Sequence, residues 1–164
     1  MTIRRTAALA AAACLLLAAA PAARAQTTTT TQRTAVTTRA SGTFEVKVQP
    51  LTTDAPGLAR LSIDKTYSGD LQGTSKGEML ANGGSEGYGV YTAIEVVTAT
   101  LGGRSGTFAL HHYGVMDGGA PTLSGSVIPG SGTGGLMGIS GTFTIILEGG
   151  GHGYTLDYTL PAGS

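Results

Sequence analysis

Apolar and polar residues alternate one by one along much of this chain from Ser41 onward, and glycine repeatedly interrupts the alternation. Phe44, Val46 and Val48, for example, are separated by single polar residues. Successive side chains of a strand point to opposite faces, so a period of two predicts strands that are buried on one face. The 27 glycines lack the regular spacing of collagen and instead indicate many tight turns. The pattern predicts an all-β domain.

Eight segments carry this strand pattern, and no segment carries a helical repeat. They are centred on Phe44–Val48 and Leu61–Asp64 and then cover Leu71–Ala81, Tyr88–Leu101, Arg104–Val115, Thr122–Val127, Thr142–Glu148 and Tyr154–Leu160. Short connections between consecutive strands favour antiparallel pairing. We expect a closed antiparallel β-barrel of about eight strands, because closure leaves no sheet edge exposed; a β-sandwich is the alternative.

One hairpin has a register that can be predicted. Gly102 and Gly103 form a two-residue turn of the type that requires positive φ, which glycine adopts freely. Pairing Leu101 with Arg104 places one set of side chains on a single face. This set is Tyr91, Ala93, Glu95, Val97, Phe108, Leu110 and His112. Because Phe108 and Leu110 are apolar, this face is predicted to point inward and to bring a carboxylate and an imidazole into the barrel.

The last hairpin follows the same pattern around Gly149, Gly150 and Gly151. Phe143, Ile145 and Leu147 are expected to face Tyr154, Leu156, Tyr158 and Leu160. Tyr154 and Tyr158 then present their hydroxyl groups to a cavity or cap it. The glycine-rich segment Gly130–Gly135 is predicted to be a mobile loop at the barrel rim, since it lacks the Gly-Lys-Ser/Thr ending of a phosphate-binding loop.

The N-terminal region has the composition of an export signal. Arg4 and Arg5 precede the apolar run 7–20, and Ala23-Arg24-Ala25 has the small-residue pattern of a cleavage site. We therefore predict a signal peptide over residues 1–25, a disordered threonine-rich tether over 26–40 and the barrel domain over 41–162. The protein is expected to be exported, to the periplasm or the extracellular space, with no membrane span after cleavage.

The charge balance argues against nucleic acid as a partner. Removal of the leader with its three arginines leaves seven basic and ten acidic residues, a net charge of −3. No basic patch remains to bind phosphates. The single cysteine, Cys14, lies in the leader, so no disulfide is expected in the mature protein. No cofactor is predicted, and the question of a homo-oligomer stays open.

Glu95 and His112 are the candidate catalytic residues. A carboxylate next to an imidazole can orient the ring and support general acid–base catalysis. The alternative interpretation is a structural polar pair that fixes the strand register. Lys65 has the same parity as Ile63 and Tyr67, so it either reaches this carboxylate or lies at the barrel mouth. No metal is predicted, because His111 and His112 are adjacent and point to opposite faces of their strand.

Four stretches of the sequence resemble one bacterial family, the domain of unknown function 3224. They are Ser41–Val46, Lys65–Leu71, Gly102–Phe108 and Val127–Gly141, in the family's order. The resemblance implies an eight-stranded barrel of the allene oxide cyclase-like group, and it implies no activity. His112 matches a histidine of the family, whereas His111 stands where the family tends to have glutamine. Many relatives lack a leader, so this chain resembles an exported variant.

These observations favour a barrel that binds a small apolar or amphipathic ligand. The candidate ligand-binding residues are Tyr91, Glu95, Phe108, Leu110, His112, Tyr154 and Tyr158, and small residues such as Gly73 and Gly77 are expected to leave room for the ligand. Two other classes stay open. One is a cyclase or isomerase that uses the Glu95–His112 pair, and the other is a structural or self-associating envelope protein.

Overall fold

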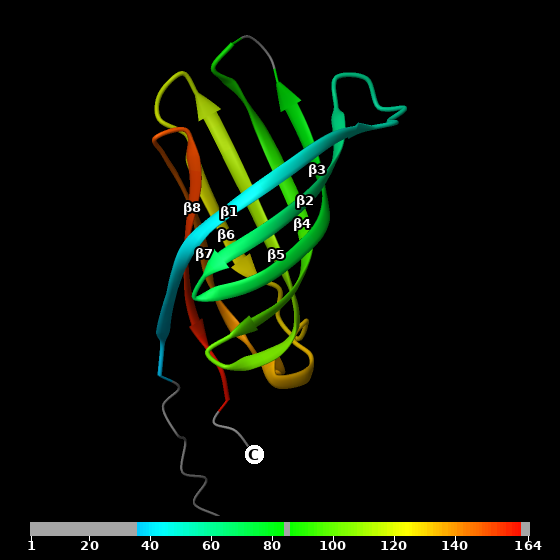
Figure 1. Cartoon of the computed structure of the whole chain (residues 1–164). Coiled ribbons are helices and arrows are strands. Elements are labelled where there is room, and N and C mark those ends of the chain that lie inside the picture. Colours follow the sequence, from blue (N-terminus) through cyan, green and yellow to red (C-terminus); the bar gives the residue numbers. More distant parts are fainter. Residues whose placement is uncertain (1–35, 84–85, 162–164) are drawn as a thin grey trace, which may run out of the picture. The chain divides into compact units, whose positions relative to one another are not determined.

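The structure is a computed structural model that describes residues 36–83 and 86–161, and within them the chain forms a closed β-barrel (Figure 1). The strands are β1 (Thr38–Leu51), β2 (Ala59–Gly69), β3 (Leu71–Gly83), β4 (Tyr88–Leu101), β5 (Arg104–Asp117), β6 (Thr122–Val127), β7 (Ser140–Glu148) and β8 (Gly151–Thr159). Each strand pairs antiparallel with the next, and β1 also pairs with β8. The predicted all-β, closed, antiparallel barrel of eight strands is confirmed.

The register predicted around the double-glycine turn is also confirmed. Leu101 pairs with Arg104, and further along the same hairpin Ala93 pairs with His112. Gly102 and Gly103 have φ angles of 56° and 75°, which allow the two-residue turn. Buried and exposed residues alternate along β4, so Glu95 points into the barrel.

The barrel begins three residues before the predicted boundary at Ser41. Thr38, Arg39 and Ala40 pair with β8, and Ala40 is 2% exposed. Arg39 donates two hydrogen bonds to Asp157, at 2.6 and 2.7 Å. The threonine-rich composition gave no strand signal for this part of β1, because its pairing depends on a strand more than a hundred residues away. The predicted leader and residues 26–35 of the predicted tether lie outside the described residues.

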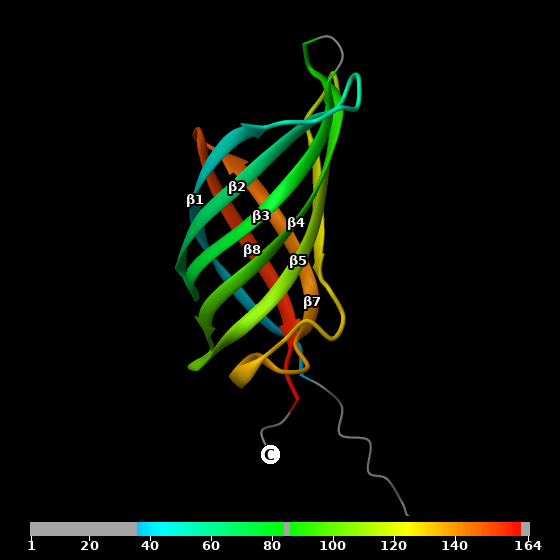
Figure 2. The ribbon, with the colours of Figure 1, turned by 90° about the vertical axis from the view of Figure 1, so that its right-hand side faces the viewer.

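One end of the barrel is closed by the segment between β6 and β7, which contains the short 3₁₀ turn η1 (Gly134–Leu136). Leu136 and Ile139 are 0% and 2% exposed and join the core cluster. Thr133 donates a backbone hydrogen bond to Thr107 of β5 at 2.8 Å. This glycine-rich segment lies at the rim, as predicted, and these contacts fasten it to the barrel. In both views it lies at the end where the described chain begins and ends (Figure 2).

The outer surface of β4 and β5 carries several exposed apolar side chains. They are Val90, Ile94, Val96, Tyr113 and Val115, with exposed fractions from 36% to 56%.

Within the described residues there is no helix long and apolar enough to cross a membrane.

Candidate functional site

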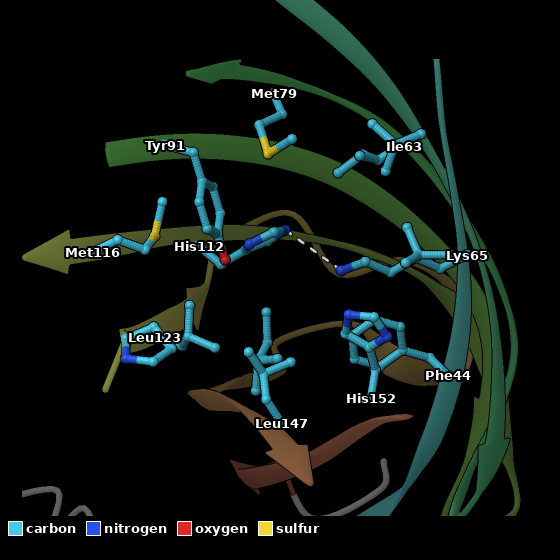
Figure 3. A pocket seen from close by; sticks show the side chains of 14 residues that line it. Phe44, Ile63, Lys65, Met79, Tyr91, His112, Met116, Leu123, Leu147 and His152 are labelled. Carbon is cyan, nitrogen blue, oxygen red and sulfur yellow. Dashed lines mark hydrogen bonds between the residues drawn. The ribbon is translucent and has the colours of Figure 1, made fainter. Parts of the chain in front are cut away.

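A pocket of about 250 Å³ lies inside the barrel toward the end opposite the β6–β7 segment. Met79, Met116 and Leu147 place it there, since each lies near the end of its strand. Figure 3 shows side chains from many strands converging on this space. The full lining is Phe44, Val46, Val48, Ile63, Lys65, Met79, Tyr91, His112, Met116, Pro121, Leu123, Ile145, Leu147 and His152. The lining is therefore mostly aliphatic and aromatic, with a few polar groups, as in sites for small organic molecules.

Lys65 and His112 are the most buried polar members of this lining. Their residues are 4% and 3% exposed, and they reach toward each other from β2 and β5 (Figure 3). Lys65 Nζ lies 3.5 Å from His112 Nε2. Both positions have the inward parity of their strands, because Ile63 and Tyr67 flank Lys65 and Leu110 and Gly114 flank His112 at a spacing of two. Alternation along the strands thus brings an ammonium and an imidazole to the inner end of an apolar pocket.

Glu95 on β4 joins these two groups into one cluster. Its Oε1 atom lies 2.7 Å from Lys65 Nζ and 3.3 Å from His112 Nε2. Glu95 is fully buried, and it is not part of the pocket lining. The carboxylate therefore lies behind the ammonium and the imidazole, and a molecule in the pocket reaches those two groups first.

Two hydroxyl groups complete the surroundings of the Glu95 carboxylate. Tyr67 donates a hydrogen bond to Oε1 at 3.1 Å, and Ser75 donates one to Oε2. Burial alone would raise the pKa of Glu95, but the hydrogen bond from His112, the charge and hydrogen bond of Lys65 and the hydrogen bond from Ser75 lower it to about 2. Glu95 is therefore ionised at neutral pH and serves as a fixed counter-charge rather than as a proton acceptor.

The Lys65 ammonium is held between this carboxylate and aromatic rings. Nζ lies 4.6 Å from the centroid of the Phe44 ring and 5.8 Å from the centroids of Tyr67 and Phe143. Such contacts stabilise a cation that has lost its water. Burial lowers the pKa of Lys65, and the charge and hydrogen bond of Glu95 oppose this shift. The amine is thus easier to deprotonate than an exposed lysine.

The second nitrogen of His112 has no hydrogen-bond partner. Nδ1 is buried, and it is the only such side-chain atom among the described residues. The ring of Tyr91 meets the His112 ring edge-on, at a centroid distance of 5.7 Å. An unpaired buried nitrogen costs free energy that a polar group of a bound molecule can recover.

The structure distributes the predicted ligand-binding residues over two regions. Tyr91 and His112 line the pocket, and Glu95 lies behind it. The others, Phe108, Leu110, Tyr154 and Tyr158, belong to the packed core and are absent from the lining. The Tyr154 hydroxyl accepts a hydrogen bond from the Leu71 backbone N–H at 2.9 Å, which gives it a structural role.

Gly73 and Gly77 do not provide space for a ligand. A Cβ atom on Gly77 would lie 2.6 Å from the Cα and Cβ atoms of Glu95, and one on Gly73 would lie equally close to Ala99. Their lack of a side chain instead allows β3 and β4 to approach closely, so this part of the expectation is wrong.

Four further residues that line the pocket were not among the predicted site residues, namely Met79, Met116, Leu123 and His152. Their inward parity was a usable signal. The closure of the barrel end decides which inward residues line a void and which are packed. The strand pattern does not predict this closure.

Metal ligands are not clustered in the described part of the chain, where no group of three or more His, Cys, Asp or Glu side chains could hold an ion. His111 points outward and forms a hydrogen bond with Thr92 at 2.9 Å. It therefore lies on the opposite face of the barrel wall from His112.

Comparison with known proteins agrees with the resemblance seen in the sequence motifs. The profile of the family described as "Protein of unknown function (DUF3224)" matches residues 40–158. The crystal structure of a protein with unknown function from the DUF3224 family of Shewanella oneidensis MR-1 is 40% identical and has a TM-score of 0.72; the match covers 77% of this chain and 100% of that chain. No curated protein matches the chain. The chain belongs to the DUF3224 family.

Proposed function

We propose that this protein binds a small, mainly apolar molecule in the pocket, with a polar end directed at Lys65 and His112. The main support for this proposal is that the pocket combines an apolar lining with two buried polar groups at its inner end. The unpaired Nδ1 atom of His112 supports the proposal, because the protein alone leaves its hydrogen-bonding capacity unused. The volume of about 250 Å³ suits a ligand of modest size.

Ligand binding is favoured over a cyclase or isomerase that uses the Glu95–His112 pair. That hypothesis uses Glu95 and His112 together on the substrate, and a direct part for Glu95 would require its carboxylate to border the pocket and to exchange a proton. Glu95 lies outside the pocket lining, accepts hydrogen bonds from Lys65, Tyr67 and Ser75 and has its pKa lowered to about 2. A carboxylate with such a low pKa is a weak base. His112 is the group of the pair that borders the pocket.

Calorimetric titration with octan-1-ol and with octanoate tests the proposed binding. The Met79→Trp variant places a larger side chain in the pocket, and Met137→Trp is its matched control, because Met137 is 68% exposed near the closed end. We expect saturable one-site binding of at least one probe to the wild type and to Met137→Trp, and strongly reduced binding to Met79→Trp. Absence of binding to the wild type, or equal binding to all three proteins, contradicts the proposal.

We also propose that the barrel acts outside the cytoplasm, on the strength of the charged, apolar and small-residue regions of the leader. Expression of the full chain in a bacterial host, followed by fractionation and mass analysis of the N-terminus, tests this. Mature protein that starts at Gln26 in an exported fraction is the expected result. An intact chain confined to the cytoplasm contradicts it.

Self-association is a second candidate function, favoured by the exposed apolar side chains on β4 and β5. A surface of this kind is typical of contacts between proteins. Sedimentation velocity over a range of concentrations is expected to show an oligomer that Ile94→Lys dissociates. A monomer at all concentrations contradicts this candidate.

A further inference from the structure

The amine of Lys65 lies at the inner end of the pocket, and Lys65 and His112 are the two buried polar residues of the lining. Lys65 is buried and lines the pocket, and its Nζ contacts Glu95 at 2.7 Å and the face of the Phe44 ring at 4.6 Å. The other two lysines of the chain, Lys47 and Lys76, are exposed. Lys65 is therefore the one lysine that an apolar molecule in the pocket would meet away from bulk water.

We propose that Lys65 captures aldehydes or ketones from the pocket by forming an imine with their carbonyl carbon. The proposal rests on the proposed ligand binding and adds the chemical class of the ligand. It joins three features of the site: a buried amine, an imidazole within reach of its protons and a buried carboxylate that stays ionised.

The three groups divide the reaction among them. In the neutral tautomer that carries its proton on Nδ1, His112 has a lone pair on Nε2, and this atom, 3.5 Å from Nζ, accepts a proton from the Lys65 ammonium. The neutral amine then attacks the carbonyl carbon, and a proton shift from nitrogen to oxygen gives a neutral carbinolamine. His112 returns its proton to the hydroxyl group, and the C–O bond breaks as water leaves. Ammonium and aldehyde are thereby converted to a protonated imine and water, with no oxidant or reductant.

The surroundings stabilise the product of this reaction. The positive charge of the protonated imine stays on the Lys65 nitrogen, opposite Glu95. Tyr67 and Ser75 keep donating to that carboxylate, so the counter-charge is held in place. The lining beyond Lys65 is apolar and accommodates the carbon chain of the carbonyl compound. Burial also lowers the pKa of Lys65, which favours the nucleophilic form of the amine.

Reductive trapping of octanal tests the proposal. The full wild-type chain, and a variant in which Lys47→Arg and Lys76→Arg leave Lys65 as the only lysine, are each incubated with equimolar octanal and sodium cyanoborohydride. Imine reduction fixes one octyl group on the amine, and peptide mass spectrometry locates it. We expect at least about tenfold more octyl label on Lys65 than on Lys47 or Lys76 in the wild-type chain, because a bound aldehyde is held near the amine. Excess octan-1-ol, which has no carbonyl group, is expected to suppress this labelling by competition.

Lys65→Arg is the matched variant, because it keeps a cation next to Glu95 and cannot form an imine. It is expected to lose the selective octyl label, because arginine does not form a reducible imine with octanal. Equal labelling of all three wild-type lysines, with octanal and octan-1-ol still bound in the pocket, overturns the imine proposal and leaves ligand binding intact. If neither octanal nor octan-1-ol binds and octanal does not label Lys65, both proposals are overturned.

Discussion

Lys65 Nζ and Glu95 Oε1 lie 2.7 Å apart, and their side chains are 3% and 0% exposed. Such a pair is costly to break on one side only, because the remaining charge is left buried and unpaired. The cluster around this ion pair connects the stability of the barrel to the chemistry of the pocket.

Replacement of Lys65 by Met is expected to lower the free energy of unfolding by roughly 3–5 kcal/mol, since it leaves the Glu95 carboxylate without its cation. The double variant Lys65→Met/Glu95→Gln is expected to recover much of this loss. Urea denaturation of the wild type, both single variants and the double variant measures the coupling. Strictly additive losses would show that the two charges do not interact.

The stability of the wild type is expected to fall as the pH is lowered from about 4.5 toward 2. The pKa of Glu95 is lowered from its ordinary value of 4.5 to about 2 in the folded protein, so the unfolded state binds this proton first. The contribution is fully present above pH 4.5 and is on the order of 3 kcal/mol. Glu95→Gln removes this titration and is expected to flatten the stability profile in that window. Identical wild-type and variant profiles would contradict the assignment.

Gly77→Ala is expected to destabilise the barrel by about 1–3 kcal/mol, because the added Cβ would lie 2.6 Å from backbone and side-chain atoms of Glu95. Gly83→Ala, on the same strand, is the control, since a Cβ there meets nothing within 4 Å. Its effect is expected to stay within about 0.5 kcal/mol. Thermal unfolding measures the stability of the two variants. Equal losses of stability would contradict the proposed close approach of β3 and β4.

Tyr154→Phe is expected to cost about 1–2 kcal/mol, because the Leu71 backbone N–H loses its acceptor in a buried position. Tyr113→Phe serves as the control, as Tyr113 is 41% exposed on the outer face. Denaturant titration distinguishes the two. A neutral Tyr154→Phe substitution would show that the hydroxyl contributes nothing to the folded state.

The strand pattern predicted the barrel and the central pair of the site. The Gly102-Gly103 turn fixed the register of β4 and β5, and alternation then placed Glu95 and His112 inside. The parity of Lys65 allowed contact with Glu95 or a place at the barrel mouth, and the structure shows the contact. Local patterns were sufficient here because each conclusion depended on one hairpin or one strand.

The location of the pocket could not be predicted in the same way. Leu136 and Ile139 close one end of the barrel from a segment without strand periodicity, so the sequence did not indicate which end stays open. As a result, Tyr154 and Tyr158 were expected near the ligand although they lie in the packed core. Side chains from many strands together fill the interior of a barrel, so its packing cannot be predicted from any single segment.

Methionine methyl groups provide the most direct test of the claim that small apolar molecules bind in this pocket. Met79 and Met116 line it, whereas Met137 is exposed near the closed end of the barrel. In a spectrum of the protein with ¹³C-labelled methionine methyl groups, addition of octan-1-ol is expected to shift the Met79 and Met116 signals in a saturable manner and to leave the Met137 signal in place. Unchanged Met79 and Met116 signals at saturating probe, or an equal shift of all three, would contradict the account.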